Sequence, residues 1–196
     1  MDIKYVKMNE KNYDFWLSER IQKIKEVDCL YNLRDNAYIS FSGGKDSTIV
    51  HYLIDMALPD NNIPRVYCNT GIDYKLITEF VSDLQKKDSR FQIIKPNKNI
   101  KDMLNEKGYP FKSKEHSLFL SVYQNKGMTS KTVRKYLGET VEGKTKLKSF
   151  QCPENLKYQF TPDFKLKVSK HCCEELKEKP FRQYEKENKK PVCITG

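Results

Sequence analysis

Short apolar runs and helical patterns alternate along the middle of the chain. Three apolar runs are each followed by a segment whose apolar residues recur at helical spacing. The pairs are 37–41 with 47–57, 65–69 with 75–87, and 91–95 with 100–107. A repeated strand-then-helix pattern is typical of α/β proteins, in which parallel strands are covered by helices on both faces. The pattern therefore predicts a doubly wound parallel sheet.

The apolar residues of two predicted helices indicate which sides pack against the sheet. Residues three or four apart lie on one side of a helix, so we expect such residues to be buried. They are Ile49, Val50, Leu53, Ile54 and Ala57 in the first helix, and Leu76, Phe80, Val81 and Leu84 in the second.

The flanking segments are less regular. Residues 11–30 predict an amphipathic N-terminal helix that packs on the core, and residues 191–196 predict a buried strand that runs into a turn. The elements expected in the irregular C-terminal region are helices over 114–124 and 131–137 and a short strand over 164–168. A chain of 196 residues is long enough to bury a core, and we expect one domain over 1–196.

The turn after the first predicted strand carries the clearest chemistry. Its residues are Ser42, Gly43, Gly44, Lys45, Asp46 and Ser47. Two glycines let the backbone approach an anion closely, and the following helix start points free amides and the positive end of its dipole at that anion. A lysine and two serine hydroxyls add further donors. The turn predicts a phosphate site.

Two common phosphate motifs do not fit this turn. A Walker A loop requires Ser or Thr after the Gly-Lys pair, and here Asp46 follows Lys45. The same motif requires a glycine five residues before Gly44, where the chain has Ile39. A dinucleotide-binding G-x-G-x-x-G string is also absent.

A second polar loop follows the second predicted strand. It contains Asn69, Thr70, Gly71 and Asp73. Both loops lie at strand carboxyl ends, where open α/β sheets bind their ligands. The two loops should therefore border one site.

These motifs resemble those of a known superfamily. The 42–47 loop is similar to the pyrophosphate-binding loop of the PP-loop ATP pyrophosphatases, within the adenine nucleotide α-hydrolases. With the 69–73 loop, the 108–111 stretch and the Cys172-Cys173 pair, the chain resembles the phosphoadenosine phosphosulfate (PAPS) reductase branch over roughly residues 35–196. The resemblance implies a Rossmann-like fold with a nucleotide-binding core over 35–110. Residues 111–196 would form a substrate and cysteine region that is shortened at its C-terminal end.

The resemblance implies cleavage of ATP at its α-phosphate, so that an acceptor is adenylylated and pyrophosphate leaves. The 42–47 loop would hold the pyrophosphate, and Lys45 would neutralise the charge that builds on it. Asp46 would either hold Mg²⁺ or cap the next helix. Asp73 has the same two options, and capping is the favoured one. Asn69, Thr70 and Gly71 would form a second loop beside the nucleotide.

Other functions stay open. Similar proteins include the Dnd-type DNA phosphorothioation enzyme, which suggests sulfur transfer to nucleic acid. Reduction of PAPS or adenosine phosphosulfate is an alternative, although the reductases' C-terminal E-C-G-x-H-type string is missing here. A non-catalytic relative that binds a nucleotide or a partner protein is a third option. The complete 42–47 loop favours ATP.

Four cysteines lie in the C-terminal part of the chain: Cys152, Cys172, Cys173 and Cys193. Cluster-bearing sulfonucleotide reductases hold [4Fe–4S] through an adjacent pair and a later pair, and no later C-x-x-C pair exists here. Zinc is a weaker alternative, and thiols without a metal are the leading interpretation.

Charge and the remaining polar residues add less. The formal net charge is +10 and the pI is about 9.2, which fits polyanionic partners but equally a lysine-rich soluble protein. The absence of a long apolar run and of an N-terminal signal predicts a cytoplasmic protein without membrane contact. A basic set could line a substrate mouth or form a solvated face, and two histidines are expected to be structural. The basic set is Lys112, Lys114, His116, Arg134 and Lys135, and the histidines are His51 and His171.

Overall fold

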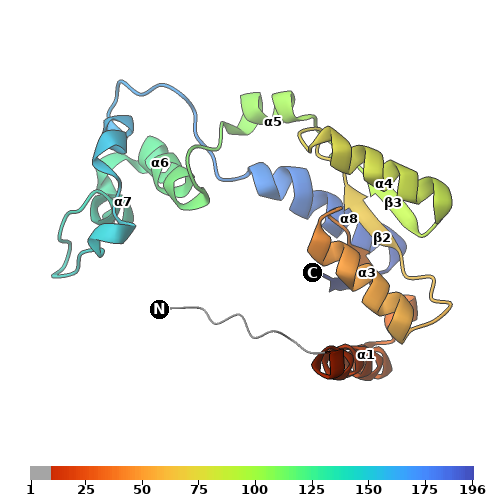
Figure 1. Cartoon of the computed structure of the whole chain (residues 1–196). Helices are drawn as coiled ribbons and strands as arrows, with labels where there is room; N and C mark the ends of the chain where they lie inside the picture. The colour runs from red at the N-terminus through yellow and green to blue at the C-terminus, as the bar shows by residue number, and fades with distance from the viewer. Residues whose placement is uncertain (1–9) are drawn as a thin grey trace. The chain divides into compact units, whose positions relative to one another are not determined.

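The computed structural model describes residues 10–196, which form two compact units (Figure 1). The first comprises 10–95 together with 180–196, and the second comprises 96–179. The expectation of a single domain over 1–196 stays a prediction. No helix within the described residues is long and apolar enough to cross a membrane.

The first unit is built on a four-stranded parallel sheet. Its strands are β1 (Ala37–Ser40), β2 (Arg65–Cys68), β3 (Phe91–Ile94) and β4 (Val192–Ile194), in the order β3-β2-β1-β4. The predicted α/β class and the parallel sheet are confirmed. The last strand forms as expected, but it is the sheet edge and is only partly buried, because it pairs with β1 alone.

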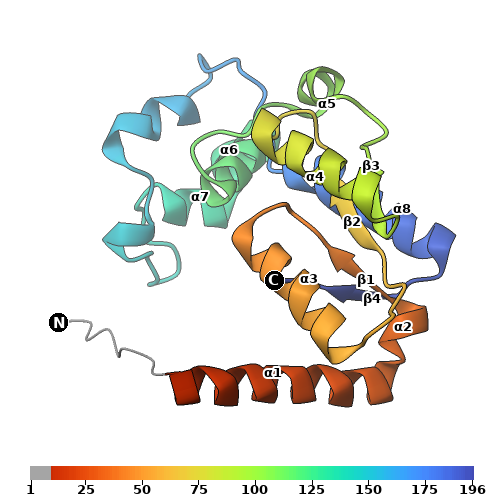
Figure 2. The same ribbon diagram turned by 45° about the vertical axis from the view of Figure 1, so that its right-hand side comes forward.

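Helices cover both faces of this sheet (Figure 2). They are α1 (Glu10–Tyr31), α2 (Leu33–Asn36), α3 (Lys45–Ala57), α4 (Lys75–Lys87) and α8 (Lys179–Asn188). On one face, Ile39 of β1 and Ile54 of α3 belong to one apolar cluster, against which Ile21 of α1 packs. On the other face, Tyr38 packs against Tyr184 of α8, with ring centroids 5.4 Å apart. Successive strand residues point to opposite faces, which produces this doubly wound arrangement.

The predicted inward faces of α3 and α4 are only partly correct. Ile54, Ala57 and Val81 are buried, but Ile49, Leu76 and Phe80 are 55%, 78% and 41% exposed. On α4 the apolar residues form two neighbouring stripes, and the one that contains Ile77, Val81 and Leu84 faces the core. Spacing alone does not tell which of two adjacent stripes a helix buries.

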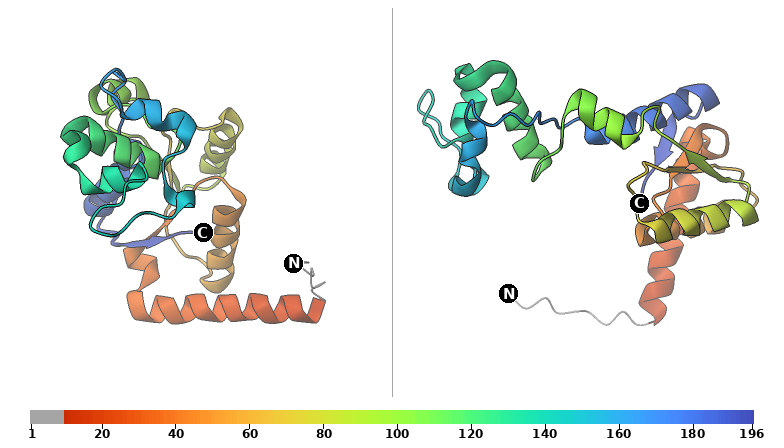
Figure 3. Two further views of the ribbon diagram at one scale, coloured as in Figure 1. Left: turned by 90° about the vertical axis from the view of Figure 1, so that its left-hand side faces the viewer. Right: turned by 90° about the horizontal axis from the view of Figure 1, so that it is seen from above.

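The second unit is built mainly of short helices (Figure 3), and its core is rich in aromatic side chains. Its elements are α5 (Ile100–Lys107), α6 (Lys114–Lys126), η1 (Gly127–Thr129), α7 (Lys131–Tyr136), η2 (Lys148–Phe150), η3 (Glu154–Phe160) and the π-helical turn η4 (Glu174–Glu178). Phe119 stacks on Tyr136 with ring centroids 4.4 Å apart. The predicted strand over 164–168 is wrong, because this segment makes only a single bridge between Val168 and Tyr109.

A buried network of charged groups joins α3 to the amino ends of β2 and β3. The Arg65 guanidinium is fully buried and donates to Asp55 Oδ1 at 2.6 Å, to Asn61 Oδ1 at 2.9 Å and to His51 Nδ1 at 3.0 Å. Arg90 donates to the same Asp55 carboxylate at 2.7 and 3.0 Å. His51 is therefore structural, as predicted.

The protonation of this network follows from its contacts. Burial acts to raise the pKa of Asp55, but hydrogen bonds from Arg90 and Asn61 and the nearby guanidinium charges bring the pKa below its usual value. Burial and the Arg65 charge lower the pKa of His51. Neutral His51 is required here because its Nδ1 accepts a hydrogen bond from Arg65.

Arg65→Met should destabilise the first unit strongly. The change leaves His51 and Asn61 without their guanidinium partner, and breaking a buried ion pair typically costs about 3–5 kcal/mol of unfolding free energy. Urea denaturation would measure the loss. Lys86→Met is the matched control, because Lys86 is an exposed member of a surface ion pair, where we expect less than about 1 kcal/mol. Equal effects of the two changes would contradict a supporting role for the network.

The network should also make stability depend on pH. Because the folded-state pKa of His51 lies below the unfolded value of about 6.5, the unfolded chain takes up the proton first, and unfolding free energy falls as the pH drops below 6.5. Denaturation between pH 7.5 and 5 should show this fall. It should be smaller in His51→Gln, and an unchanged pH profile in that variant would exclude His51 as its source.

Candidate functional site

The 42–47 loop connects β1 to α3 and is held by its own serines. The Ser47 hydroxyl lies 3.0 Å from Ser42 Oγ, accepts from the Ser42 amide at 3.2 Å and donates to the Gly44 carbonyl at 3.0 Å. Ser42 Oγ also accepts from the Gly44 amide at 3.3 Å. The serines therefore fix the loop backbone. This role is additional to the one that the sequence predicts, in which their hydroxyls donate to a phosphate.

Gly43 is required by both conformation and space. Its φ is +74°, a left-handed conformation that residues with a Cβ rarely adopt. A Cβ at this position would lie 2.7 Å from Ile77 Cγ2 and 3.2 Å from Val81 Cγ2 of α4. The loop thus passes closer to α4 than any side chain at position 43 would allow.

Lys45 and Asp46 begin α3 and face solvent. The Lys45 ammonium donates to Asp46 Oδ1 at 2.6 Å, and the two side chains are 85% and 64% exposed. Gly44 is the N-cap residue, and no side chain caps this helix, so Asp46 does not perform the capping role considered for it. The first amides of α3 lack intrahelical acceptors and remain able to bind an anion.

The 69–73 loop folds on itself at the end of β2. Asp73 Oδ2 accepts from the Thr70 amide at 2.9 Å and from the Thr70 hydroxyl at 2.7 Å. Asn69 Oδ1 accepts from the Gly71 amide at 3.0 Å, and Gly71 has a φ of +81°. The N-cap of α4 is Tyr74, without a side-chain bond, so the favoured prediction that Asp73 caps α4 is wrong.

The carboxyl edge of the sheet brings the two loops to neighbouring strands. β1 and β2 are paired through Ser40 and Val66, and each loop directly follows its strand. Gly196, which follows β4, lies at the start of α3, and the sequence does not indicate this position. A Cβ there would lie 2.8 Å from the Asp46 carbonyl carbon and 2.9 Å from the Ser47 amide nitrogen. The C-terminal marker accordingly lies beside α3 in Figures 1 and 2. If the strand predicted over 191–196 is placed in parallel beside β1, as β4 is here, Gly196 falls near the 42–47 loop.

The four candidate cluster cysteines have separate surroundings. Cys152 is buried in the aromatic core of the second unit, where burial raises the pKa of its thiol. Cys172 and Cys173 precede η4 in the same unit, whereas Cys193 lies on β4 in the first. Within residues 10–196 no three Cys, His, Asp or Glu side chains form a group that could hold a metal ion. The assignment of these four cysteines to a [4Fe–4S] cluster or to zinc stays a prediction, and none of the six cysteines, all within the described chain, forms a disulfide.

The basic set, which could line a substrate mouth or form a solvated face, divides into two kinds. His116 is completely buried, with Nδ1 at 2.9 Å from the Tyr136 hydroxyl and Nε2 at 2.7 Å from Gln159 Oε1. It is a core residue of the second unit, so the mouth assignment is wrong for it. Lys112, Lys114 and Lys135 are on the surface or close to it, and Arg134 donates to Glu139 at 2.6 Å. His171 is half-exposed and its Nδ1 lies 2.6 Å from Glu174 Oε2, and its structural role stays a prediction.

Comparison with known proteins agrees with this geometry. The family model described as the phosphoadenosine phosphosulfate reductase domain matches residues 36–140, more than half of the chain. No curated protein and no solved structure gave a match. The matched segment begins just before β1 and contains both the 42–47 and the 69–73 loops. The chain therefore belongs to the phosphoadenosine phosphosulfate reductase domain family, within the adenine nucleotide α-hydrolase (PP-loop) superfamily.

Proposed function

We propose that this protein binds ATP at the 42–47 loop and cleaves it to AMP and pyrophosphate, so that an acceptor is activated. The observation that carries the proposal is the complete Ser-Gly-Gly-Lys-Asp-Ser loop, which joins a parallel strand to an uncapped helix start. A helix start without a side-chain cap leaves its first amides available to a phosphate oxygen. The family's nucleotide-binding character supports an adenine nucleotide as the ligand.

Each loop residue has a chemical role in this proposal. The α3 amides and the Gly43–Gly44 backbone bind the leaving pyrophosphate, and the ammonium of Lys45 neutralises its developing charge. Binding a phosphate would draw Lys45 away from Asp46, which frees a carboxylate for Mg²⁺. Asn69 and Thr70, whose side chains bond within their own loop, would lie beside the nucleotide. Asp73 instead holds the second loop in shape.

The acceptor and the identity of the nucleotide complete the proposal. The acceptor that the resemblance favours is nucleic acid, through sulfur transfer in a cytoplasmic setting. PAPS is the competing ligand, because the matched family carries its name. A loop suited to holding a leaving pyrophosphate favours ATP, since reduction of PAPS releases none.

Lys45→Ala should weaken ATP binding at least tenfold, because the variant loses the one loop cation that faces solvent. Isothermal titration calorimetry with ATP and Mg²⁺ would measure the change. Lys87→Ala is the matched control, an exposed lysine at the end of α4 that should bind ATP as the wild type does.

The same titration with PAPS, followed by assays for pyrophosphate and for sulfite, distinguishes ATP cleavage from PAPS reduction and from binding without catalysis. Pyrophosphate release that disappears in Lys45→Ala supports ATP cleavage. Sulfite release in the presence of a thiol would identify a reductase instead. Binding without either product would indicate a non-catalytic relative.

Gly43→Ala should lower both stability and nucleotide affinity. The methyl group would contact Ile77 Cγ2 and force a left-handed φ on an alanine, which costs about 1–2 kcal/mol. Thermal unfolding and ATP titration would measure the two effects. Gly143→Ala is the control, since Gly143 has a similar φ of +70° but open space around it and lies outside the loop. If both variants retain full ATP affinity, the close approach to α4 is not needed for binding.

A further inference from the structure

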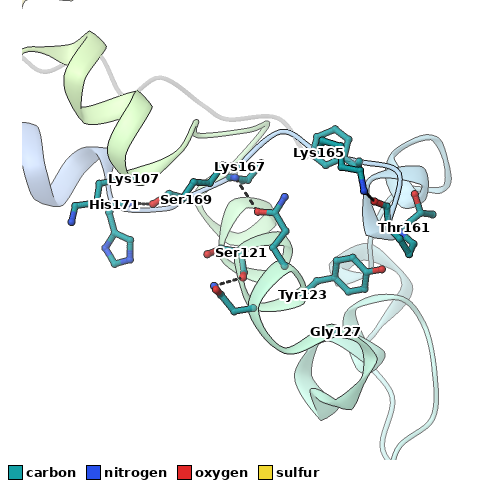
Figure 4. A pocket seen from close by; sticks show the side chains of 14 residues that line it. Lys107, Ser121, Tyr123, Gly127, Thr161, Lys165, Lys167, Ser169 and His171 are labelled. Carbon is teal, nitrogen blue, oxygen red and sulfur yellow. Dashed lines mark hydrogen bonds between the residues drawn. The ribbon is translucent and has the colours of Figure 1, made fainter.

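The second unit contains a pocket of about 700 Å³, lined by both polar and apolar residues, and the lining includes neither the 42–47 nor the 69–73 loop. It lies between α6 and the extended segment 161–171, with the end of α5 alongside. Figure 4 shows Lys107, Ser169 and His171 towards one end of the pocket and Thr161 and Lys165 towards the other. The sequence analysis had assigned no function to these residues, apart from a structural role for His171.

The pocket lining contains cations and hydrogen-bonding groups but no carboxylate. Its positively charged side chains are Lys107, Lys165 and Lys167, and His171 adds a titratable ring. Lys107 is neutralised by Glu106 at 3.0 Å, and His171 lies 2.6 Å from Glu174. These two groups therefore contribute little net attraction for an anion.

Lys165 and Lys167 keep their charge. Each donates to a backbone carbonyl at 2.6 Å, Lys165 to that of Pro162 and Lys167 to that of Glu106. Within residues 10–196 neither forms an ion pair, and both side chains belong to exposed residues. A carbonyl uses one of the three ammonium donors, so each lysine retains donors for a phosphate oxygen.

The segment that carries the two lysines is fastened to α6. The Gln124 side chain donates to the Leu166 carbonyl at 2.7 Å and accepts from the Val168 amide at 3.0 Å. Val168 and Ser169 are buried at the base of the segment. The two lysine backbones are thus held in place before any ligand binds, which lowers the entropic cost of binding.

The net charge of the whole second unit also favours an anionic ligand. Residues 96–179 contain 18 Lys and Arg against 10 Asp and Glu, a net charge of +8 out of +10 for the chain. The first unit is therefore nearly neutral, and the basic character of the protein is concentrated in the unit that contains this pocket. A concentrated positive field attracts polyanions and favours their association.

The cations are spread along the pocket instead of converging on one point (Figure 4). A single phosphate ion would need donors that converge, whereas a chain of phosphates contacts cations one after another. Tyr123 lines the same pocket and offers an aromatic ring against which a base could stack. We propose that this pocket binds single-stranded nucleic acid, with Lys165 and Lys167 contacting consecutive parts of its phosphate backbone.

The test is fluorescence anisotropy with a labelled single-stranded oligothymidylate at several salt concentrations. Lys165→Glu/Lys167→Glu should weaken binding at least tenfold and lower the slope of log K against log salt by about 1.4, since each phosphate contact on a single strand contributes about 0.7. Lys101→Glu/Lys148→Glu is the control, with the same change of net charge at exposed lysines of the unit that lie outside the pocket. The control should bind almost as the wild type does. Circular dichroism would establish that both variants are folded.

Three outcomes would overturn the proposal. Equal losses in the two double variants would mean diffuse attraction to the basic unit. Absence of oligonucleotide binding by the wild type would exclude the ligand. Equal competition by inorganic polyphosphate and by oligothymidylate would show that bases are not recognised and that a bare polyphosphate is the ligand. ATP binding at the loop is measured separately, and Lys45→Ala should retain oligonucleotide binding, so this proposal and the nucleotide proposal can fail independently.

Discussion

The candidate site depends on how tightly the chain turns from β1 into α3. The turn uses a left-handed φ at Gly43 and passes so close to α4 that Ile77 and Val81 leave no room for a Cβ. This contact ties the loop to the helix that follows the second polar loop. Because the serines bond to the loop backbone, the amides at the start of α3 are presented in one arrangement. The conformation of the loop is therefore built into the packing of the first unit.

The two edges of the sheet have different tasks. The carboxyl edge carries polar loops whose side chains are exposed or bonded within the loop, and it is where a ligand can approach. The amino edge carries Arg65 and Arg90, which share the Asp55 carboxylate. A buried charge without its partners is strongly unfavourable, so this network specifies how α3 and two strands pack. The ion pairs at the amino edge thus hold together the strands whose carboxyl ends carry the polar loops.

Charge divides between the two units, and this bears on function. The 42–47 loop lies in a unit that is almost neutral, and the donors it can offer a nucleotide are local: backbone amides and one exposed lysine. The second unit holds most of the net positive charge and a pocket without carboxylates. The two proposed ligands therefore depend on different interactions. ATP would be bound by convergent hydrogen bonds, and single-stranded nucleic acid by positive charges spread over the second unit.

Periodicity and turn chemistry by themselves determined the order of strands and helices, the parallel sheet and the position of the phosphate loop. These are local properties, since apolar spacing and glycine placement act over a few residues. Tertiary structure alone decided which of two apolar stripes α4 buries and that His116 is a core residue. It also decided that Asp73 bonds back to Thr70 and that Gly196 reaches the start of α3. Each of these depends on groups distant in sequence, or on a choice between hydrogen-bond partners of similar energy, and such choices are made only when the whole chain packs.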